Sequence, residues 1–227
     1  MNYNVRINEV KNQDSKVKAF ANVTFGNALT VRNISIVERR DGDGCFISMP
    51  SYKSGYVDEY GMPEYKDICF PITSEFHREL SENILAAYEA KMDGTLKKNG
   101  MDFGDGTNEP EYSVKITPIE KEGSTLCGYG QITVENCFVI SNVNVVQGQY
   151  GEFVSMPSFK SGDKKGSYRD IAFPVTKEFR EKLFASVIEN YHQAIERNQT
   201  MDYSRAAQPQ QSMVAESRAM EPVAALR

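Results

Sequence analysis

The sequence contains no tryptophan and has only two histidines and four cysteines among its 227 residues. It also lacks any apolar run near the roughly 18 residues that are needed to span a bilayer, so we expect no membrane partner. Its first ten residues do not show the basic region and apolar stretch that are typical of a secretory signal. We therefore expect a cytoplasmic protein. The formal net charge is −5 with both signs well mixed, which is ordinary for a soluble protein.

The sequence does contain one unusual string written twice. FISMPSYKSG occupies 46–55 and FVSMPSFKSG occupies 153–162, and the two agree at eight of ten positions. A second block follows each copy, YKDICFPITSEF at 65–76 and YRDIAFPVTKEF at 168–179, with agreement at eight of twelve positions. Most of the mismatches exchange residues of similar shape and charge. The chain therefore consists of two tandem copies of one domain.

The order of the expected elements predicts an α+β fold for each copy. Three strands with a period-2 apolar pattern come first, followed by a short strand, a solvent-facing loop, an extended stretch and an amphipathic helix. In the first copy these segments lie near 3–7, 17–25, 29–36, up to 50, 52–64, 68–71 and from 73 onward. Strands first and a helix last favour a mainly antiparallel sheet with the helix packed on it.

Two local features are repeated in both copies. The apolar residues of the third strand slip by one position, from Leu29 and Val31 to Ile34 and Ile36, and from Phe138 and Ile140 to Val143 and Val145. Such a slip would invert the buried face of a regular strand, so we predict a β-bulge near Asn33 and near Asn142. Each helix has an apolar residue at every fourth position, and Thr73 is the expected N-cap of the first helix.

These patterns predict four parts along the chain. The first domain spans 1–93, a glycine-rich polar linker spans 94–111, and the second domain spans 112–198. The remaining residues, 199–227, are rich in Gln, Ala, Ser and Met without periodicity, so we expect a disordered tail.

No histidine or cysteine recurs in both copies. Cys45, Cys69, His77 and His192 are replaced in the other copy by Glu152, Ala172, Arg180 and Glu89. The four cysteines show no CxxC spacing. Asp67 and Asp170 do recur, but acid–base catalysis needs a positioned partner, and no second carboxylate, histidine or cysteine recurs beside them. We therefore expect no enzymatic activity, no cofactor, no metal site and no small-molecule substrate.

The paired blocks resemble the septation protein SpoVG family, also called stage V sporulation protein G. That family has an extended segment ending in Met-Pro-Ser, a basic loop, and an aromatic-basic-Asp-Ile-Ala-His-Pro-Ile stretch before a C-terminal helix. The matching residues are Met49, Pro50, Ser51, Lys66, Asp67, Ile68, Pro71 and Ile72 in the first copy, and Met156, Pro157, Ser158, Arg169, Asp170, Ile171, Ala172, Pro174 and Val175 in the second.

The resemblance implies a small, dimeric, nucleic-acid-binding regulator that acts on DNA or RNA in septation, sporulation and gene expression. This sequence departs from the family pattern at two places. An aromatic residue replaces the first of two basic residues after Met-Pro-Ser, as Tyr52 and Phe159, and phenylalanine replaces the histidine before proline, as Phe70 and Phe173.

The charge balance favours the second copy as the nucleic-acid-binding one. Residues 1–93 hold 11 Lys and Arg against 14 Asp and Glu, a net charge of −3, whereas residues 112–198 hold 10 against 10. Phosphate neutralisation supplies much of the affinity for nucleic acid, and aromatic side chains stack on bases. The candidate binding residues are Lys160, Lys164, Lys165, Arg169 and Phe159 in the second copy, with Lys53, Lys66 and Tyr52 in the first.

The duplication of a dimeric domain predicts an intramolecular pseudo-dimer, in which the two repeats are partners of each other. The eighteen-residue linker is long enough to let them pack together. Two functions remain open. The chain is either a nucleic-acid-binding regulator or a protein-interaction module that has lost nucleic-acid binding.

Overall fold

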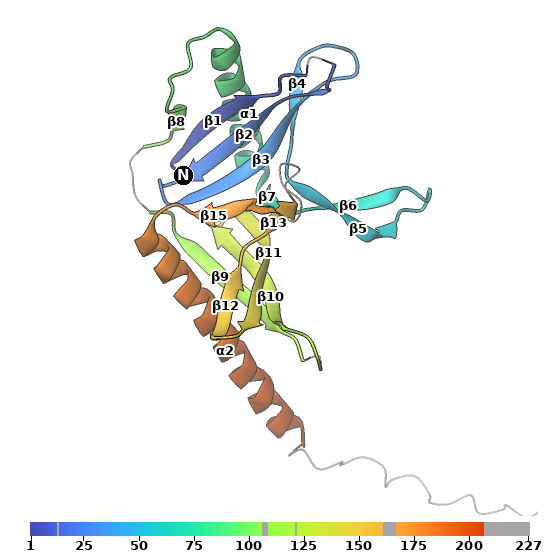
Figure 1. The fold of residues 1–227 in the computed structure, drawn as a ribbon, viewed down its shortest axis with the longest axis vertical. Coiled ribbons are helices and arrows are strands. Elements are labelled where there is room, and N and C mark those ends of the chain that lie inside the picture. The colour runs from blue at the N-terminus through green and yellow to red at the C-terminus, as the bar shows by residue number, and fades with distance from the viewer. Residues whose placement is uncertain (13, 106–108, 121, 161–166, 207–227) are drawn as a thin grey trace, which may run out of the picture.

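Both repeats form the same series of strands followed by one helix in the computed structural model, which describes residues 1–12, 14–105, 109–120, 122–160 and 167–206, with side chains to residue 200. The first repeat contains β1 (Tyr3–Glu9), β2 (Val17–Phe25), β3 (Leu29–Glu38), β4 (Cys45–Ser48), β5 (Ser51–Val57), β6 (Pro63–Asp67), β7 (Cys69–Pro71) and α1 (Ser74–Met92). After β8 (Met101–Phe103), the second repeat contains β9 (Tyr112–Pro118), β10 (Leu126–Val134), β11 (Phe138–Gly148), β12 (Gly151–Ser155), β13 (Ser158–Lys160), β14 (Tyr168–Asp170), β15 (Ala172–Pro174) and α2 (Lys177–Ala206). The predicted α+β class is confirmed (Figure 1).

The long strands of each repeat form an antiparallel meander, β1-β2-β3 in the first and β9-β10-β11 in the second. Alternate residues point into the core, as the period-2 pattern predicts. The turn between β2 and β3 lies at Gly26 and Asn27, which both have positive φ, and the Ala28 N–H donates to the Phe25 carbonyl at 2.9 Å. Two successive positive φ angles are typical of the turn that matches the twist of a tight hairpin.

The helices begin and pack as the sequence predicts. The Thr73 hydroxyl accepts a hydrogen bond from the Phe76 N–H at 3.2 Å and so caps the start of α1, and Thr176 does the same for Phe179 in α2. The buried face of α1 consists of Phe76, Leu80, Ile84 and Ala87, and that of α2 includes Phe179, Leu183, Val187 and Tyr191. Among the described residues, neither helix is both long and apolar enough to cross a membrane.

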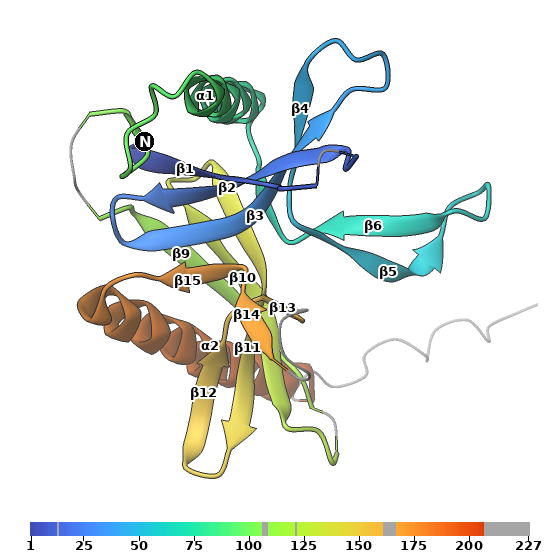
Figure 2. The same ribbon diagram turned by 45° about the horizontal axis from the view of Figure 1, so that its top comes forward.

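The two repeats exchange their short strands. β7 of the first repeat pairs with β11 of the second, with Cys69 opposite Ile140, and β15 of the second pairs with β3 of the first, with Ala172 opposite Val31. Figures 1 and 2 show β15 lying along β3, at the boundary between the two sheets. The chain is therefore the predicted pseudo-dimer, and each repeat completes the sheet of the other.

The predicted bulges are confirmed, and the exchange explains why both copies have them. Asn33 and Asn142 have φ of 62° and 58°, a conformation that Asn tolerates better than most residues. The pairing of β2 with β3 jumps there from Ala21–Ile34 to Val23–Val31. Before the bulge the outer edge of β3 pairs with β15, and after the bulge the same edge pairs with β4. The extra residue lies where the strand changes partner.

One hydrophobic core runs through both repeats. It includes fully buried side chains from β2, β3 and α1 and their counterparts in β10, β11 and α2. At its centre the ring of Phe138 lies 5.1 Å from that of Phe25 and 6.3 Å from that of Phe76, both of which belong to the other repeat. Such aromatic contacts contribute beyond the apolar area that they bury, so this aromatic cluster joins the two repeats in one core.

The segment 52–64 was expected to be a loop, but most of it lies in a β-hairpin. β5 and β6 pair with each other and project away from both sheets (Figure 2). The expected exposure to solvent is confirmed, since Tyr56 and Tyr60 are 70% and 82% exposed. The loop expectation was wrong because the pairing of β5 with β6 depends on cross-strand register, which the short and irregular apolar pattern did not reveal.

The segment 94–111, expected to be a plain linker, contains β8, which extends the first sheet by pairing with β1. A glycine on each side of β8 lets its backbone lie close to the backbone of the N-terminal segment. Gly100 and Gly104 have φ of 90° and 79°, and a Cβ at either position would lie 2.5 Å from a carbonyl oxygen of the N-terminal segment. At the other end of the chain α2 continues to Ala206, beyond the expected boundary at 198. The remaining tail, 207–227, lies outside the described residues.

Replacing Phe138 by alanine should lower the free energy of unfolding by about 3–5 kcal/mol, as is typical of a buried Phe→Ala change. Because Phe138 packs against the other repeat, urea denaturation should still show one transition for the whole chain, at a lower midpoint. Tyr150→Ala, at a position that is 98% exposed, is the control and should shift stability by less than about 0.5 kcal/mol. Two transitions, only one of them shifted, would contradict a shared core.

Candidate nucleic-acid interface

Each repeat presents a hairpin directly after its Met-Pro-Ser string. The first hairpin is β5–β6 and the second is β13–β14; the residues 161–166 between β13 and β14 lie outside the described residues. The base of each is closed by one short backbone hydrogen bond, from Ile68 to the Pro50 carbonyl and from Ile171 to the Pro157 carbonyl, both at 2.7 Å. The two hairpins are therefore equivalent structures on the two halves of the pseudo-dimer.

Aromatic and basic side chains stand opposite each other in both hairpins. Tyr52 pairs with Lys66 and Lys53 with Tyr65 in the first hairpin. Phe159 pairs with Arg169 and Lys160 with Tyr168 in the second. Because successive residues of a strand face opposite sides, each hairpin carries one aromatic–cation pair on each of its two faces. Such a surface suits a nucleic acid, whose phosphates attract cations and whose bases stack on rings.

The structure brings most of the predicted residues together and adds two. Lys160, Arg169 and Phe159 lie on the second hairpin and Lys53, Lys66 and Tyr52 on the first, whereas Lys164 and Lys165 fall outside the described residues. Tyr65 and Tyr168, which are 64% and 67% exposed, were not among the residues predicted from the sequence. The sequence does repeat a tyrosine at the start of the second shared block in both copies. Only the strand register shows that this tyrosine lies opposite a lysine.

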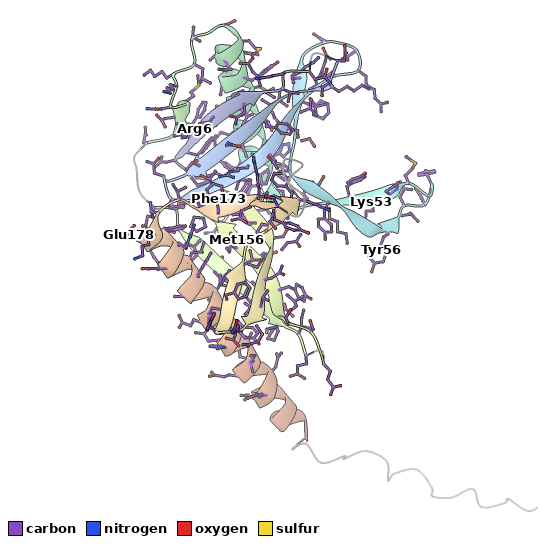
Figure 3. The ribbon with its side chains drawn as sticks, viewed as in Figure 1. Arg6, Lys53, Tyr56, Met156, Phe173 and Glu178 are labelled. Carbon is purple, nitrogen blue, oxygen red and sulfur yellow. The ribbon has the colours of Figure 1, made fainter. Side chains whose placement is uncertain are left out.

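The first hairpin differs from the second in its acidic residues, two of which stabilise its shape. Asp58 accepts hydrogen bonds from the N–H groups of Tyr60 and Met62 at 2.9 and 2.8 Å, which holds the turn. Glu64 accepts one from the buried Ser54 hydroxyl at 3.1 Å. Lys66 lies 5.4 Å from the ring centre of Tyr56. Figure 3 shows Tyr56 and Lys53 out on this projecting hairpin.

A cleft of about 470 Å³ lies where the first hairpin meets the second repeat. Its lining comes from both repeats: Tyr52, Lys66, Asp67 and Phe70 from the first, and Ser141 and Asn142 from the bulge in β11. The Ser141 hydroxyl donates to the Ile68 carbonyl at 2.8 Å, which ties the bulge to the base of the hairpin. Strand exchange thus places each hairpin beside the bulge of the opposite repeat.

The equivalent junction of the second hairpin contains an arginine where the first has a serine. Arg32, in the bulge of β3, aligns with Ser141. The backbone N–H of Arg32 donates to the Ile171 carbonyl at 2.7 Å. The guanidinium of Arg32 lies over the ring of Phe173, 4.0 Å from the ring centre. Sequence reasoning could not find Arg32 as an interface residue, because it belongs to the acidic repeat and reaches the second hairpin only through strand exchange.

Burial governs the titration of the groups near the first junction. Desolvation raises the pKa of the Asp67 carboxyl. Burial also raises the pKa of the Cys69 thiol, and the negative charge of Asp67 adds to this shift. Within the described residues, no three His, Cys, Asp or Glu side chains gather in a way that could hold a metal ion.

A sequence model of the SpoVG family matches this chain twice, at residues 1–90 and 111–193. Relatives named septation protein SpoVG are similar to it over the length of one repeat. The protein of Treponema denticola is 44% identical over 69 residues, which are 30% of this chain and 72% of the relative. Those of Clostridium beijerinckii and Clostridioides difficile are 39% and 38% identical over 82 residues, which are 36% of this chain and 87% and 86% of the relatives.

Cys69 should react with a thiol reagent such as DTNB at least about tenfold more slowly than Cys127 in the native protein at pH 8. Cys69 is fully buried on the exchanged strand β7, whereas Cys127 is partly exposed, and a raised pKa also lowers the fraction of reactive thiolate. Variants that keep Cys69 alone or Cys127 alone among the four cysteines make the two rates separable. Equal rates without denaturant would mean that β7 does not stay paired with β11.

Proposed function

Because this chain belongs to the SpoVG family and carries the family domain twice, we propose that it is a non-enzymatic, nucleic-acid-binding regulatory protein whose main interface is the second hairpin. Its relatives are named for septation, and we extend that process to this chain as part of the proposal. The observation that carries the proposal is the position of Arg32 beside the base of β13–β14.

Local charge supports the second hairpin, rather than the first, as the site of nucleic-acid binding. With Arg32 added, the sequence segment from Lys160 to Asp170 contributes five basic residues, Arg32, Lys160, Lys164, Lys165 and Arg169, against Asp163 and Asp170, which gives a net charge of +3. The first hairpin has Lys53 and Lys66 against four acidic residues, a net charge of −2. Affinity for nucleic acid depends on the neutralisation of phosphates by basic side chains, so this difference in net charge favours binding at the second hairpin.

The ring of Phe173 supports the role of Arg32. A guanidinium stacked on an aromatic ring is held flat by the cation–π attraction and still presents N–H groups in its plane. A flat, oriented arginine suits contact with a phosphate or a base better than a mobile one. The phenylalanine that replaces the family's histidine therefore positions this arginine in the proposed interface.

The first hairpin favours a second candidate function, the binding of another protein. Its tip and strands expose six apolar or aromatic side chains, Tyr52, Tyr56, Val57, Tyr60, Met62 and Tyr65. Exposed aromatic and methionine side chains are enriched at protein interfaces. The acidic surroundings of this hairpin disfavour phosphate, so a protein partner suits it better than nucleic acid does.

The triple substitution K160A/K164A/K165A should weaken binding to DNA or RNA and reduce the slope of log K against log salt concentration by up to about three units. Fluorescence anisotropy with a labelled oligonucleotide at rising salt measures both quantities. The matched variant K53A/K66A in the first hairpin should cause a smaller loss. Unchanged affinity in the triple variant would remove the second hairpin as the interface, and no binding by the wild type at low salt would favour the protein-interaction function.

Exchanging the two bulge residues tests the junction itself. Arg32→Ser should lower affinity several-fold and reduce the salt slope by about one unit, because one phosphate-facing cation is lost. Ser141→Arg, the reciprocal change, should raise affinity by placing a cation at the first junction. Thermal unfolding of both variants checks that the fold is retained. If a folded Arg32→Ser protein bound as the wild type does, Arg32 would have no part in the interface.

A further inference from the structure

The first sheet has a groove of about 950 Å³ on the face away from α1. Tyr3, Val5 and Ile7 of β1 point into the core, so Asn4 and Arg6 between them point to the opposite face. The groove is lined mainly by polar side chains of β1, β2 and β3, namely Asn4, Arg6, Asn22, Thr24, Thr30 and Arg32. Phe173 of the exchanged strand β15 also lines it, and Figure 3 shows Arg6 and Phe173 on this sheet.

The strand β8 and the residues just before it hold two of the groove residues in place. The Asn4 amide donates to the Asp102 carboxylate at 2.8 Å, and the Arg6 Nε donates to the Asn99 carbonyl at 3.3 Å. In the described part of the second repeat, β9 has β10 as its only strand partner. Its residues equivalent to Arg6, Asn22 and Arg32 are Lys115, Gln131 and Ser141. Within the described residues, the β8 side of the groove and its two arginines therefore belong to the first repeat alone.

The side chains of the groove suit the edges and faces of nucleobases. Amide and guanidinium groups form paired hydrogen bonds with base edges. The guanidinium of Arg32, held against Phe173 at 4.0 Å, presents its other flat face for stacking on a base. The groove thus combines hydrogen-bonding groups with a stacking surface.

The charge of the groove favours unpaired bases over a duplex. Its only charged side chains in the described structure are Arg6, Arg32 and Asp102, a net charge of +1. A duplex site typically makes about six to ten phosphate contacts, and two arginines cannot supply them. Base edges are fully accessible only in single strands, where contacts to the bases supply much of the specificity.

We infer that this groove binds the unpaired bases of a single-stranded nucleic acid whose backbone is held by the second hairpin. The inference rests on the proposed function and deepens it, because it names the form of the partner and a second contact surface. Arg32 connects the two surfaces, since it lines the groove and its backbone N–H also donates to the Ile171 carbonyl at the base of β13–β14. One strand can thus pass from the hairpin onto the sheet without crossing the acidic first hairpin.

The test uses the full chain and two labelled 20-nucleotide probes of mixed sequence, one single-stranded and one duplex. R6A/N22A should weaken single-strand binding by about tenfold, since a paired contact to a base is worth roughly that factor. Duplex affinity should change by less than about twofold. The matched control is K115A/Q131A, which alters the equivalent positions of the second sheet and should change single-strand affinity by less than about twofold.

Ultraviolet crosslinking of the wild type to a bromouracil-containing single strand gives a readout that does not depend on how the variants fold. Crosslinked peptides should come from β1, β2 and β15 as well as from the second hairpin. Crosslinks from the hairpin alone, or equal losses in R6A/N22A and K115A/Q131A, would overturn the inference. Duplex-only binding that is lost in K160A/K164A/K165A would overturn the inference and leave the proposed function intact. A wild type that binds neither probe would overturn both.

Discussion

The pairing of β7 with β11 and of β15 with β3 joins the two halves of this chain, and the rest of the structure depends on it. Each of these pairs continues by one backbone hydrogen bond beyond the end of the short strand, from the Ile72 N–H to the Cys137 carbonyl and from the Val175 N–H to the Ala28 carbonyl. Each exchanged strand occupies a sheet edge that would otherwise be open to aggregation. The same pairing draws the sheet ends together, so that Phe138 packs against Phe25 and a single core forms. Two repeats of about ninety residues, each near the lower limit for a stable core, thereby become one larger folding unit.

The exchange also explains the bulges and the position of the hairpins. One edge of β3 must pair with β15 of the other repeat and then with β4 of its own, and Arg32 and Asn33, which have no register partner in β2, lie at this change of partner. The hairpin follows directly from the strand that pairs after the bulge, so its base is held beside the bulge of the opposite repeat. Any residue in a bulge is therefore presented to the hairpin of the other half, as Ser141 is to the first hairpin.

Covalent linkage of the two copies allows the two junctions to differ, which a symmetric dimer of identical chains cannot do. In this chain one junction combines Arg32 with the basic second hairpin, whereas the other combines Ser141 with an acidic hairpin that exposes aromatic side chains. The strand β8 adds a further difference between the repeats, because it pairs with β1 of the first sheet and forms one side of the groove there. The proposed division, with nucleic acid on one side and a protein on the other, follows from these differences in charge and exposure.

The sequence by itself determined the duplication, the α+β class, the bulges near Asn33 and Asn142, the cap at Thr73 and the buried face of each helix. These depend on local periodicity and on the agreement between the two copies, both of which are visible in one dimension. Only the tertiary structure decided that the hairpins place Tyr65 and Tyr168 opposite lysines, that β8 joins the first sheet, and that Arg32 belongs to the second junction. Strand register and strand exchange are relations between segments distant in the chain. Hydrogen bonds between backbones carry little information about side-chain identity, so no local pattern reports which edge a short strand will fill.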